Sequence, residues 1–405
     1  MTSKSQNLFQ LAVIVSALGF FVDVYDLLLF AIIRKPSLAA LGLTPQQVLD
    51  EGEILISLQM TGMLIGGVVF GITGDKKGRL SVLFGSILLY SLANILNGMV
   101  STLPQYMVLR FIAGFGLSGE LGAGLTLVSE LLPKEKRSMA VSIVTGFGIF
   151  GAVSAFFINQ LFDWRTCYYI GGGMGIVLLL MRVRVHESGL YAFAKQAHVQ
   201  HGNFLMFFNN RKRFLRYLKC ILIGVPVWYI IGVLVTFSDQ FGKEFGITDI
   251  DPGRAVMFLY LGIAAGNFSV GALSQKMQSR KKPLFIFSGI TILFVILFFL
   301  QRGNEALFYT ICMGLGFGAG FNVVYHTFAV EQFGTNLRAS AAISVPNMVR
   351  GSLPLILLMF KQLRSFTGNY VKGAVVTGII LFIISLAASI FTRESFGEDL
   401  DYLET

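Results

Sequence analysis

The chain has 405 residues, of which 54% are hydrophobic and only 13% are charged. This balance excludes a soluble globular domain and is typical of a protein that crosses a membrane many times. The net charge of +10 does not indicate nucleic-acid binding, because the Lys and Arg residues lie in short loops between apolar runs.

The first half of the sequence contains six apolar runs, each long enough to cross a bilayer core of ~30 Å as a helix. The first run carries acids and is followed by no small-residue cleavage site, so we interpret it as a helix rather than a cleavable signal. Residues 34–53 are predicted to form an outer loop. The six predicted spans are residues 8–33, 54–73, 80–100, 105–132, 139–161, and a sixth that follows Asp163-Trp164-Arg165 and ends at Arg182.

A basic polar segment, residues 184–213, separates these runs from six more. We interpret it as a linker helix held at the anionic membrane surface by its basic side chains, and no feature indicates the alternative of a regulatory segment. The later spans are predicted at residues 214–238, 254–275, 283–301, 305–331, 339–360 and 370–392. The sequence therefore predicts an all-α integral membrane fold with 12 transmembrane helices in two pseudo-symmetric six-helix bundles, residues 1–183 and 214–405.

The distribution of basic residues predicts the orientation of this fold. About two thirds of the 32 Lys and Arg residues lie on the termini and on one set of alternate loops, which are therefore expected in the cytoplasm.

Internal repeats support the two-bundle arrangement. The charged turn at residues 71–79, GITGDKKGR, has a weaker copy at residues 271–281. Glu130 is followed seven residues later by Arg137, and Glu331 by Arg338, at the same separation of about 200 residues that relates the two turns. An internal duplication is the simplest explanation, and duplicated halves are common in transporters.

Four ionisable side chains are predicted near the middle of the membrane, where each costs roughly 2.5–3.5 kcal/mol and therefore indicates function. Asp23 and Asp26 share a helix face, and two carboxylates so close favour a proton on one of them. Asp26 could instead lie near outer water. Glu120 and Arg350 are placed ~15–18 Å from the cytoplasmic Glu130 and Arg338 by the helical rise. An arginine there requires an anion, either a protein carboxylate or a substrate.

Other polar residues could line a cavity between the helices, or could equally make hydrogen bonds between helices. The shallower Arg110 could be a structural tie, and His326 is more simply a satisfied polar residue than a proton relay. Cys167, Cys220 and Cys312 show no pairing or metal-binding pattern, so we expect packing residues and no metal site. The predicted cavity residues, besides Arg350, are Tyr25, Gln59, Asn97, Trp228, Tyr229, Asn322, Tyr325, His326 and Asn347.

Several motifs resemble the major facilitator superfamily. The turn at residues 71–79 resembles its G-x-x-x-D-K/R-x-G-R pattern, and the two Glu/Arg pairs resemble the E-x6-R motif of the sugar-porter branch. Residues 19–27, 110–114 and 118–122 resemble the first and fourth helices of metabolite:proton symporters, and residues 186–188 resemble a P-E-S motif with His in place of Pro. The second-half turn departs from the pattern of residues 71–79. It has Gln275 in place of the acid, and it lacks the second glycine of the pattern.

This resemblance implies alternating access, in which two bundles move about a central site. It also implies a cytoplasmic ion-pair latch, expected to be weaker in the second half. The latch residues would be Asp75, Arg79, Glu130, Arg137, Glu331 and Arg338.

The sequence therefore predicts a transporter in a bacterial inner membrane, driven by the proton gradient and needing no cofactor. Its expected partners are a small polar, anionic or zwitterionic metabolite, protons and the bilayer. Arg350 would attract the anion, and Asp23, Asp26 and Glu120 would carry the proton. The same residues would serve an exporting antiporter, and a facilitator without proton coupling ranks third. A membrane enzyme is disfavoured because no catalytic motif is present. A sensor is disfavoured because we expect no soluble output domain in this chain. A monomer is expected.

Overall fold

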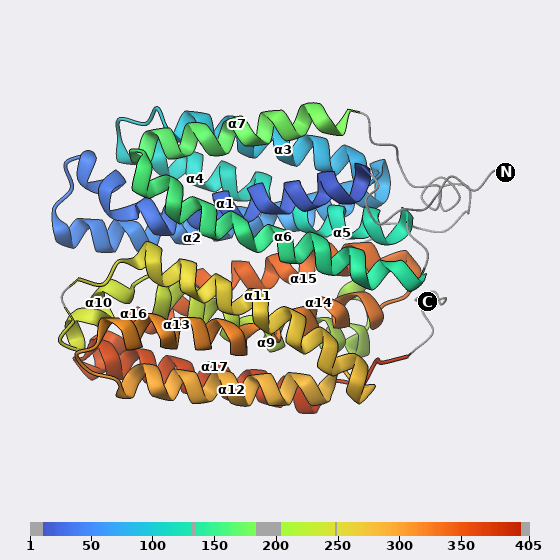
Figure 1. Cartoon of the computed structure of the whole chain (residues 1–405). Coiled ribbons are helices and arrows are strands. Elements are labelled where there is room, and N and C mark those ends of the chain that lie inside the picture. The colour runs from blue at the N-terminus through green and yellow to red at the C-terminus, as the bar shows by residue number, and fades with distance from the viewer. Residues whose placement is uncertain (1–10, 132–133, 184–203, 248, 398–405) are drawn as a thin grey trace.

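The computed structural model describes the backbone of residues 11–131, 134–183, 204–247 and 249–397, and these residues form helices and short connections. The side chains of residues 75, 129–131, 134–142, 335, 336 and 339 lie outside this description. Two stacks of helices lie side by side with their axes nearly parallel (Figure 1). The predicted all-α fold is confirmed.

The first stack holds seven helical segments. They are α1 (Leu11–Ala40), α2 (Pro45–Lys77), α3 (Arg79–Asn97), α4 (Leu103–Leu117), α5 (Glu120–Leu131), α6 (Lys134–Leu161) and α7 (Trp164–Arg182). The second stack holds η1 (Phe204–Phe207), α9 (Arg211–Tyr229), η2 (Ile230–Val235), α10 (Ser238–Glu244), α11 (Pro252–Met277), α12 (Lys281–Leu300), α13 (Glu305–Ala319), α14 (Asn322–Glu331), α15 (Thr335–Gly351), α16 (Leu353–Thr367) and α17 (Tyr370–Ile390).

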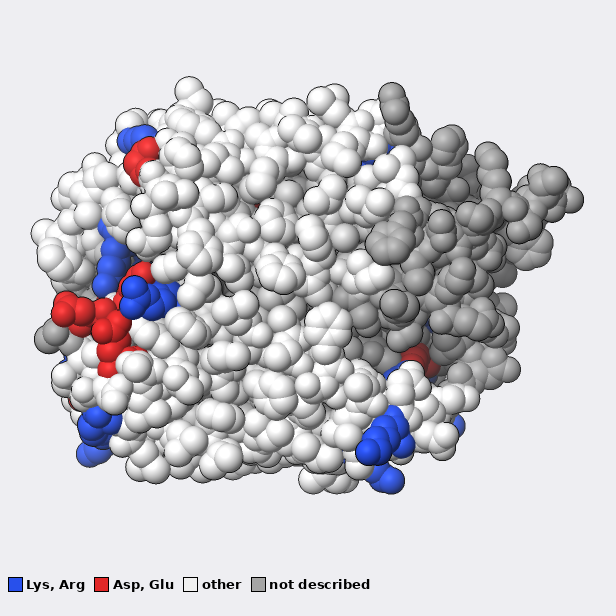
Figure 2. All heavy atoms as spheres, viewed as in Figure 1, with Lys and Arg blue, Asp and Glu red and all other residues white. Residues whose placement is uncertain are grey.

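Eleven helical stretches in the described residues are long and apolar enough to cross a membrane. The predicted sixth span corresponds to α7, whose three consecutive glycines and two arginines reduce its hydropathy, and α7 packs along α3 within the first stack (Figure 1). Charged side chains gather at the two ends of the visible face and leave a broad uncharged band between them (Figure 2). The molecule is therefore an integral membrane protein with lipid around that band.

The duplication is visible in the backbone. Gly78 ends α2 with φ 97°, and Gln278 ends α11 in the left-handed conformation with φ 46°. The two helix breaks are 200 residues apart, as the two turns in the sequence are. The second half therefore ends its helix at the equivalent position but in a different conformation, with ψ 45° at Gln278 and ψ 159° at Gly78.

One expectation about helix boundaries was wrong, and several predicted spans contain a break that was not predicted. Residues 34–53 do not form a loop, because α1 continues to Ala40 and α2 begins at Pro45 behind a capping box made by Thr44 and Gln47. Several spans are also interrupted: α4 and α5 are separated at residues 118–119, and α13 and α14 at residues 320–321. The predicted span 214–238 contains the π-helical segment η2 and a break at Phe237.

The boundaries of the two bundles stay a prediction, because residues 184–203 of the predicted linker lie outside the described part of the chain. The three cysteines are buried and unpaired, as expected for packing residues. The helix interruptions matter for the site, because Glu120 begins α5, Asn322 begins α14 and Arg350 lies in the last turn of α15. Discontinuous helices near the midplane are where transporters commonly build binding sites.

Candidate functional site

The centre of the molecule contains an ion pair that joins the two stacks. Arg350 on α15 places its Nη2 atom 3.8 Å from Oδ2 of Asp23 on α1. Asp23 is fully buried, and the Arg350 side chain is 9% exposed. Neither carboxylate oxygen of Asp23 has a hydrogen-bond donor within bonding distance, so the ion pair is long and not reinforced.

A second ion pair lies within the first stack. Arg182, the last residue of α7, donates hydrogen bonds to both carboxylate oxygens of Glu120, one of them 2.9 Å long. Both side chains are almost completely buried. A methyl group at Gly19 would collide with this pair, so the glycine allows α1 to pass close to it. Arg182 was not predicted as a partner, because it lies near the predicted end of its span.

Asp26 faces a different cation. Its carboxylate lies among Arg110 and Asn94 and is close to Gly171 of α7. The Arg110 guanidinium is buried and lies 5.2 Å from the centre of the Phe30 ring and 3.4 Å from the Tyr168 hydroxyl, to which it donates a hydrogen bond. Asp23 and Asp26 therefore share one helix but face different arginines, one in each half of the chain.

Aromatic and polar residues of the second stack surround Arg350. Its guanidinium acts electrostatically on Tyr260, Tyr325 and His326. The ring centres of Tyr325 and His326 are 4.3 Å apart. Sequence reasoning missed Tyr260, because a tyrosine within an apolar run carries no signal until its neighbours in space are known.

The other predicted cavity residues divide into two groups. Asn347 donates a 2.8 Å hydrogen bond across the boundary to the Ser118 carbonyl, and Asn322 lies next to Asn267. Gln59 and Trp228 line a small cavity between the stacks, in which Gln59 donates a 3.4 Å hydrogen bond to the Leu27 carbonyl.

The remaining three residues form no hydrogen bond or ion pair across the boundary within the described part of the chain. The Tyr25 hydroxyl bonds the Cys167 carbonyl at 2.9 Å, and the Tyr229 hydroxyl bonds the Ala374 carbonyl at 2.7 Å, so each ties helices within its own half. Asn97 is the buried last residue of α3. The structure does not bring these three side chains together with Arg350.

The cytoplasmic motifs are only partly described, because the side chains of Asp75, Glu130 and Arg137 lie outside the described part. Arg79 donates to the Gly74 carbonyl at 3.2 Å, and Arg338 donates to the Val330 carbonyl at 3.1 Å.

Glu331 pairs with Arg280 of the second-half turn at 2.7 Å. The same turn is held by Glu394, which follows the last helix. Glu394 accepts hydrogen bonds from the Ser279 hydroxyl at 2.5 Å and from the Arg280 backbone at 2.8 Å. Burial alone would raise the pKa of Glu394, but these hydrogen bonds and those from the Lys281 and Phe396 backbones outweigh it and lower the pKa to about 2.

Charged residues also join the two stacks at the opposite end of the molecule, which the sequence predicts to be the outer one. Asp239 on α10 lies 3.5 Å from Arg34 and 2.9 Å from Lys35, both on α1. Arg364 on α16 lies 3.8 Å from Glu53 on α2. Arg34 is buried and its guanidinium stacks over the Phe237 ring at 4.2 Å. These ion pairs were not predicted, because residues 34–53 were expected to form a loop.

Comparison with known proteins decides the family. The profile of the Major Facilitator Superfamily matches residues 11–358. The chain belongs to this superfamily. It is 27% identical to the sialic acid transporter NanX of Escherichia coli, over 95% of this chain and 92% of that protein. It is 26% identical to the 3-(3-hydroxy-phenyl)propionate transporter of the same organism, over 87% of this chain and 89% of that protein.

A solved structure of a proton:xylose symporter of the superfamily, bound to 6-bromo-6-deoxy-D-glucose, superposes with a TM-score of 0.73. The match covers 96% of this chain and 97% of that one at 16% identity, and it shows a common fold. The chain is therefore a multi-pass membrane transporter of organic metabolites, not an enzyme.

Proposed function

We propose that this transporter takes up a carboxylate-bearing metabolite together with a proton. The observation that carries the proposal is the ion pair between Arg350 and Asp23, which joins the two halves at the centre of the molecule. Two relatives support the substrate class, because their names identify a sialic acid and a phenylpropionate as their substrates, and both of these compounds are carboxylates.

The geometry provides a route to coupling. Arg350 can satisfy either the Asp23 carboxylate or a substrate carboxylate, and a second anion beside ionised Asp23 would be repelled. A proton on Asp23 removes that repulsion and releases Arg350 for the substrate. Proton binding and substrate binding therefore favour each other, and this reciprocity is the thermodynamic requirement for symport.

The three acids have different surroundings, which suggests different roles. Glu120 is held by two hydrogen bonds from Arg182, and Asp26 faces Arg110 within the first half. Of these three acids, only Asp23 pairs with a residue of the other half in the described part of the chain. We assign the proton that is exchanged with the substrate to Asp23. Asp26 lies next to it on the same helix face, and the charge of Glu120 contributes to the electrostatic potential at both residues.

Alternating access requires contacts at both ends that break in turn. The outer ion pairs of Asp239 and Arg364 and the cytoplasmic contacts of Glu331 and Glu394 are suited to this role. Breaking one group of contacts while the other persists would expose the Asp23–Arg350 site to a single side of the membrane. An inner-membrane location, with both termini in the cytoplasm, remains part of the proposal.

The test is uptake of radiolabelled carboxylates into proteoliposomes with an imposed inward proton gradient. Arg350→Ala is expected to abolish accumulation. Arg254→Ala, which removes an arginine from an exposed pair with Glu305, is the matched control and is expected to transport normally. Normal accumulation by Arg350→Ala would refute the assignment. Accumulation driven only by an outward proton gradient would instead indicate the exporting antiporter.

A further inference from the structure

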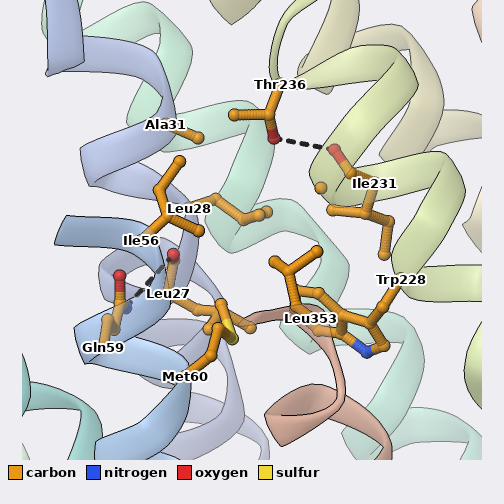
Figure 3. A pocket seen from close by; sticks show the side chains of 11 residues that line it. Leu27, Leu28, Ala31, Ile56, Gln59, Met60, Trp228, Ile231, Thr236 and Leu353 are labelled. Atoms are coloured by element: carbon orange, nitrogen blue, oxygen red, sulfur yellow. Dashed lines mark hydrogen bonds between the residues drawn. The ribbon is translucent and has the colours of Figure 1, made fainter. Parts of the chain in front are cut away.

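A cavity lies between the two halves, beside the central ion pair. Its walls include Leu27 of α1, Ile56 and Met60 of α2, Trp228 of α9, Ile231 of η2 and Leu353 of α16 (Figure 3). Each half contributes to the lining, so the cavity lies where an alternating-access transporter holds its substrate. Its volume of about 20 Å³ holds little more than one water molecule, so a substrate would occupy it only when the two halves separate.

Two polar groups in this cavity are committed to the backbone. The Thr236 hydroxyl donates a 2.7 Å hydrogen bond to the Ile231 carbonyl, and the Gln59 amide donates to the Leu27 carbonyl (Figure 3). Apart from the Gln59 side-chain carbonyl oxygen and the Trp228 indole N–H, the surface offered to a ligand is hydrocarbon and thioether. A hydroxyl group placed against it would lose its hydrogen bonds to water without replacement.

Both residues of the ion pair are close in sequence to residues of the cavity wall. Leu27 is four residues after Asp23, and Leu353 is three residues after Arg350. One helical turn rises ~5.4 Å, so the apolar wall begins about one turn from the carboxylate and guanidinium. A ligand whose carboxylate meets Arg350 would therefore direct the rest of its body toward Leu27, Met60 and Trp228.

We infer that the substrate is a carboxylate with an apolar, aromatic or hydrocarbon body, and not a polyhydroxylated acid. The inference rests on the proposed function, since it takes the carboxylate at Arg350 as given. It also discriminates between the two relatives, which are 27% and 26% identical to this chain. The cavity walls resemble a site for a phenylpropionate more than a site for a sugar acid.

The position of Trp228 provides a direct assay. The chain has 2 tryptophans, and the other, Trp164, stacks on Arg165 at the start of α7. In a Trp164→Phe background, the fluorescence of Trp228 alone reports occupancy of the cavity. The probes are 3-phenylpropionate, gluconate and the uncharged 3-phenylpropionamide, titrated into the purified protein.

The expected result is that 3-phenylpropionate binds at least about tenfold more tightly than gluconate, which is the scale of discrimination by an apolar pocket. Met60→Gln, which adds an amide at similar volume, is expected to reduce that ratio. Gluconate binding as tightly as 3-phenylpropionate would overturn the inference and leave the proposed function intact. Failure of both carboxylates to bind, or equal binding of the acid and the amide, would overturn the proposed function itself.

Discussion

The buried pair of Glu120 and Arg182 gives a prediction whose magnitude follows from the structure. Both side chains are at most 2% exposed, and two hydrogen bonds join them. Removing either partner leaves an uncompensated buried charge, which typically costs ~3–5 kcal/mol. We therefore expect Glu120→Gln and Arg182→Met each to destabilise the protein by about 4 kcal/mol.

The assay is thermal unfolding of purified protein in detergent. Unfolding entropy of about 2 cal/mol/K per residue, summed over the 405 residues, converts ~4 kcal/mol into a decrease in Tm of roughly 5 °C. The double variant is expected to lose much less than the sum of the two, because it leaves no unpaired charge. The exposed Arg254–Glu305 pair is the control, and its removal should change Tm little. Unchanged Tm in the single variants, or strictly additive losses in the double variant, would refute the reasoning.

Three further predictions concern the two ends of the molecule. Gln278 has φ 46°, a conformation that is unfavourable for a residue with a Cβ atom, so Gln278→Gly should raise stability by about 1 kcal/mol. Gly78 has φ 97°, so Gly78→Ala should lower the Tm. Thermal unfolding of both variants checks these expectations. Asp239→Asn should weaken the contact with Arg34 and Lys35. The labelling by maleimide of a cysteine introduced at Leu28, in the cavity wall, should therefore increase. Unchanged labelling would exclude a role for Asp239 in closing that end of the molecule. Because the pKa of Glu394 is lowered to about 2, its contribution to stability should be complete above the unfolded value near 4.5 and disappear as the pH falls through 2. The Tm difference between wild type and Glu394→Gln should therefore be constant from pH 7 to 5 and decrease below it.

The sequence predicted the parts of this fold that depend on local chemistry. Apolar runs locate the spans because every backbone polar group in lipid must be satisfied within a helix. A buried charge is visible in one dimension, so Asp23, Glu120 and Arg350 were identified as unusual before their surroundings were known. The repeated turns predicted equivalent helix ends, and these were found at Gly78 and Gln278.

The partners of these charges could not be predicted, because partner choice depends on distances between helices. Arg182 meets Glu120 although 62 residues separate them, and Asp239 meets Arg34 across 205 residues. The break before Glu120 also gave no clear signal, since Ser118 and Gly119 are common within membrane helices. The apolar cavity was missed because its wall is built from residues that, taken singly, look like packing.

The central claim is that Asp23 carries the proton that is exchanged with the substrate at Arg350. The most direct measurement is substrate-driven proton movement, followed with a pH-sensitive dye inside proteoliposomes that initially have no pH gradient. For wild type, external carboxylate should acidify the lumen. Asp23→Asn, which resembles the protonated residue, should still exchange labelled for unlabelled substrate but should move no protons. Acidification that persists at the wild-type rate in Asp23→Asn would contradict the account.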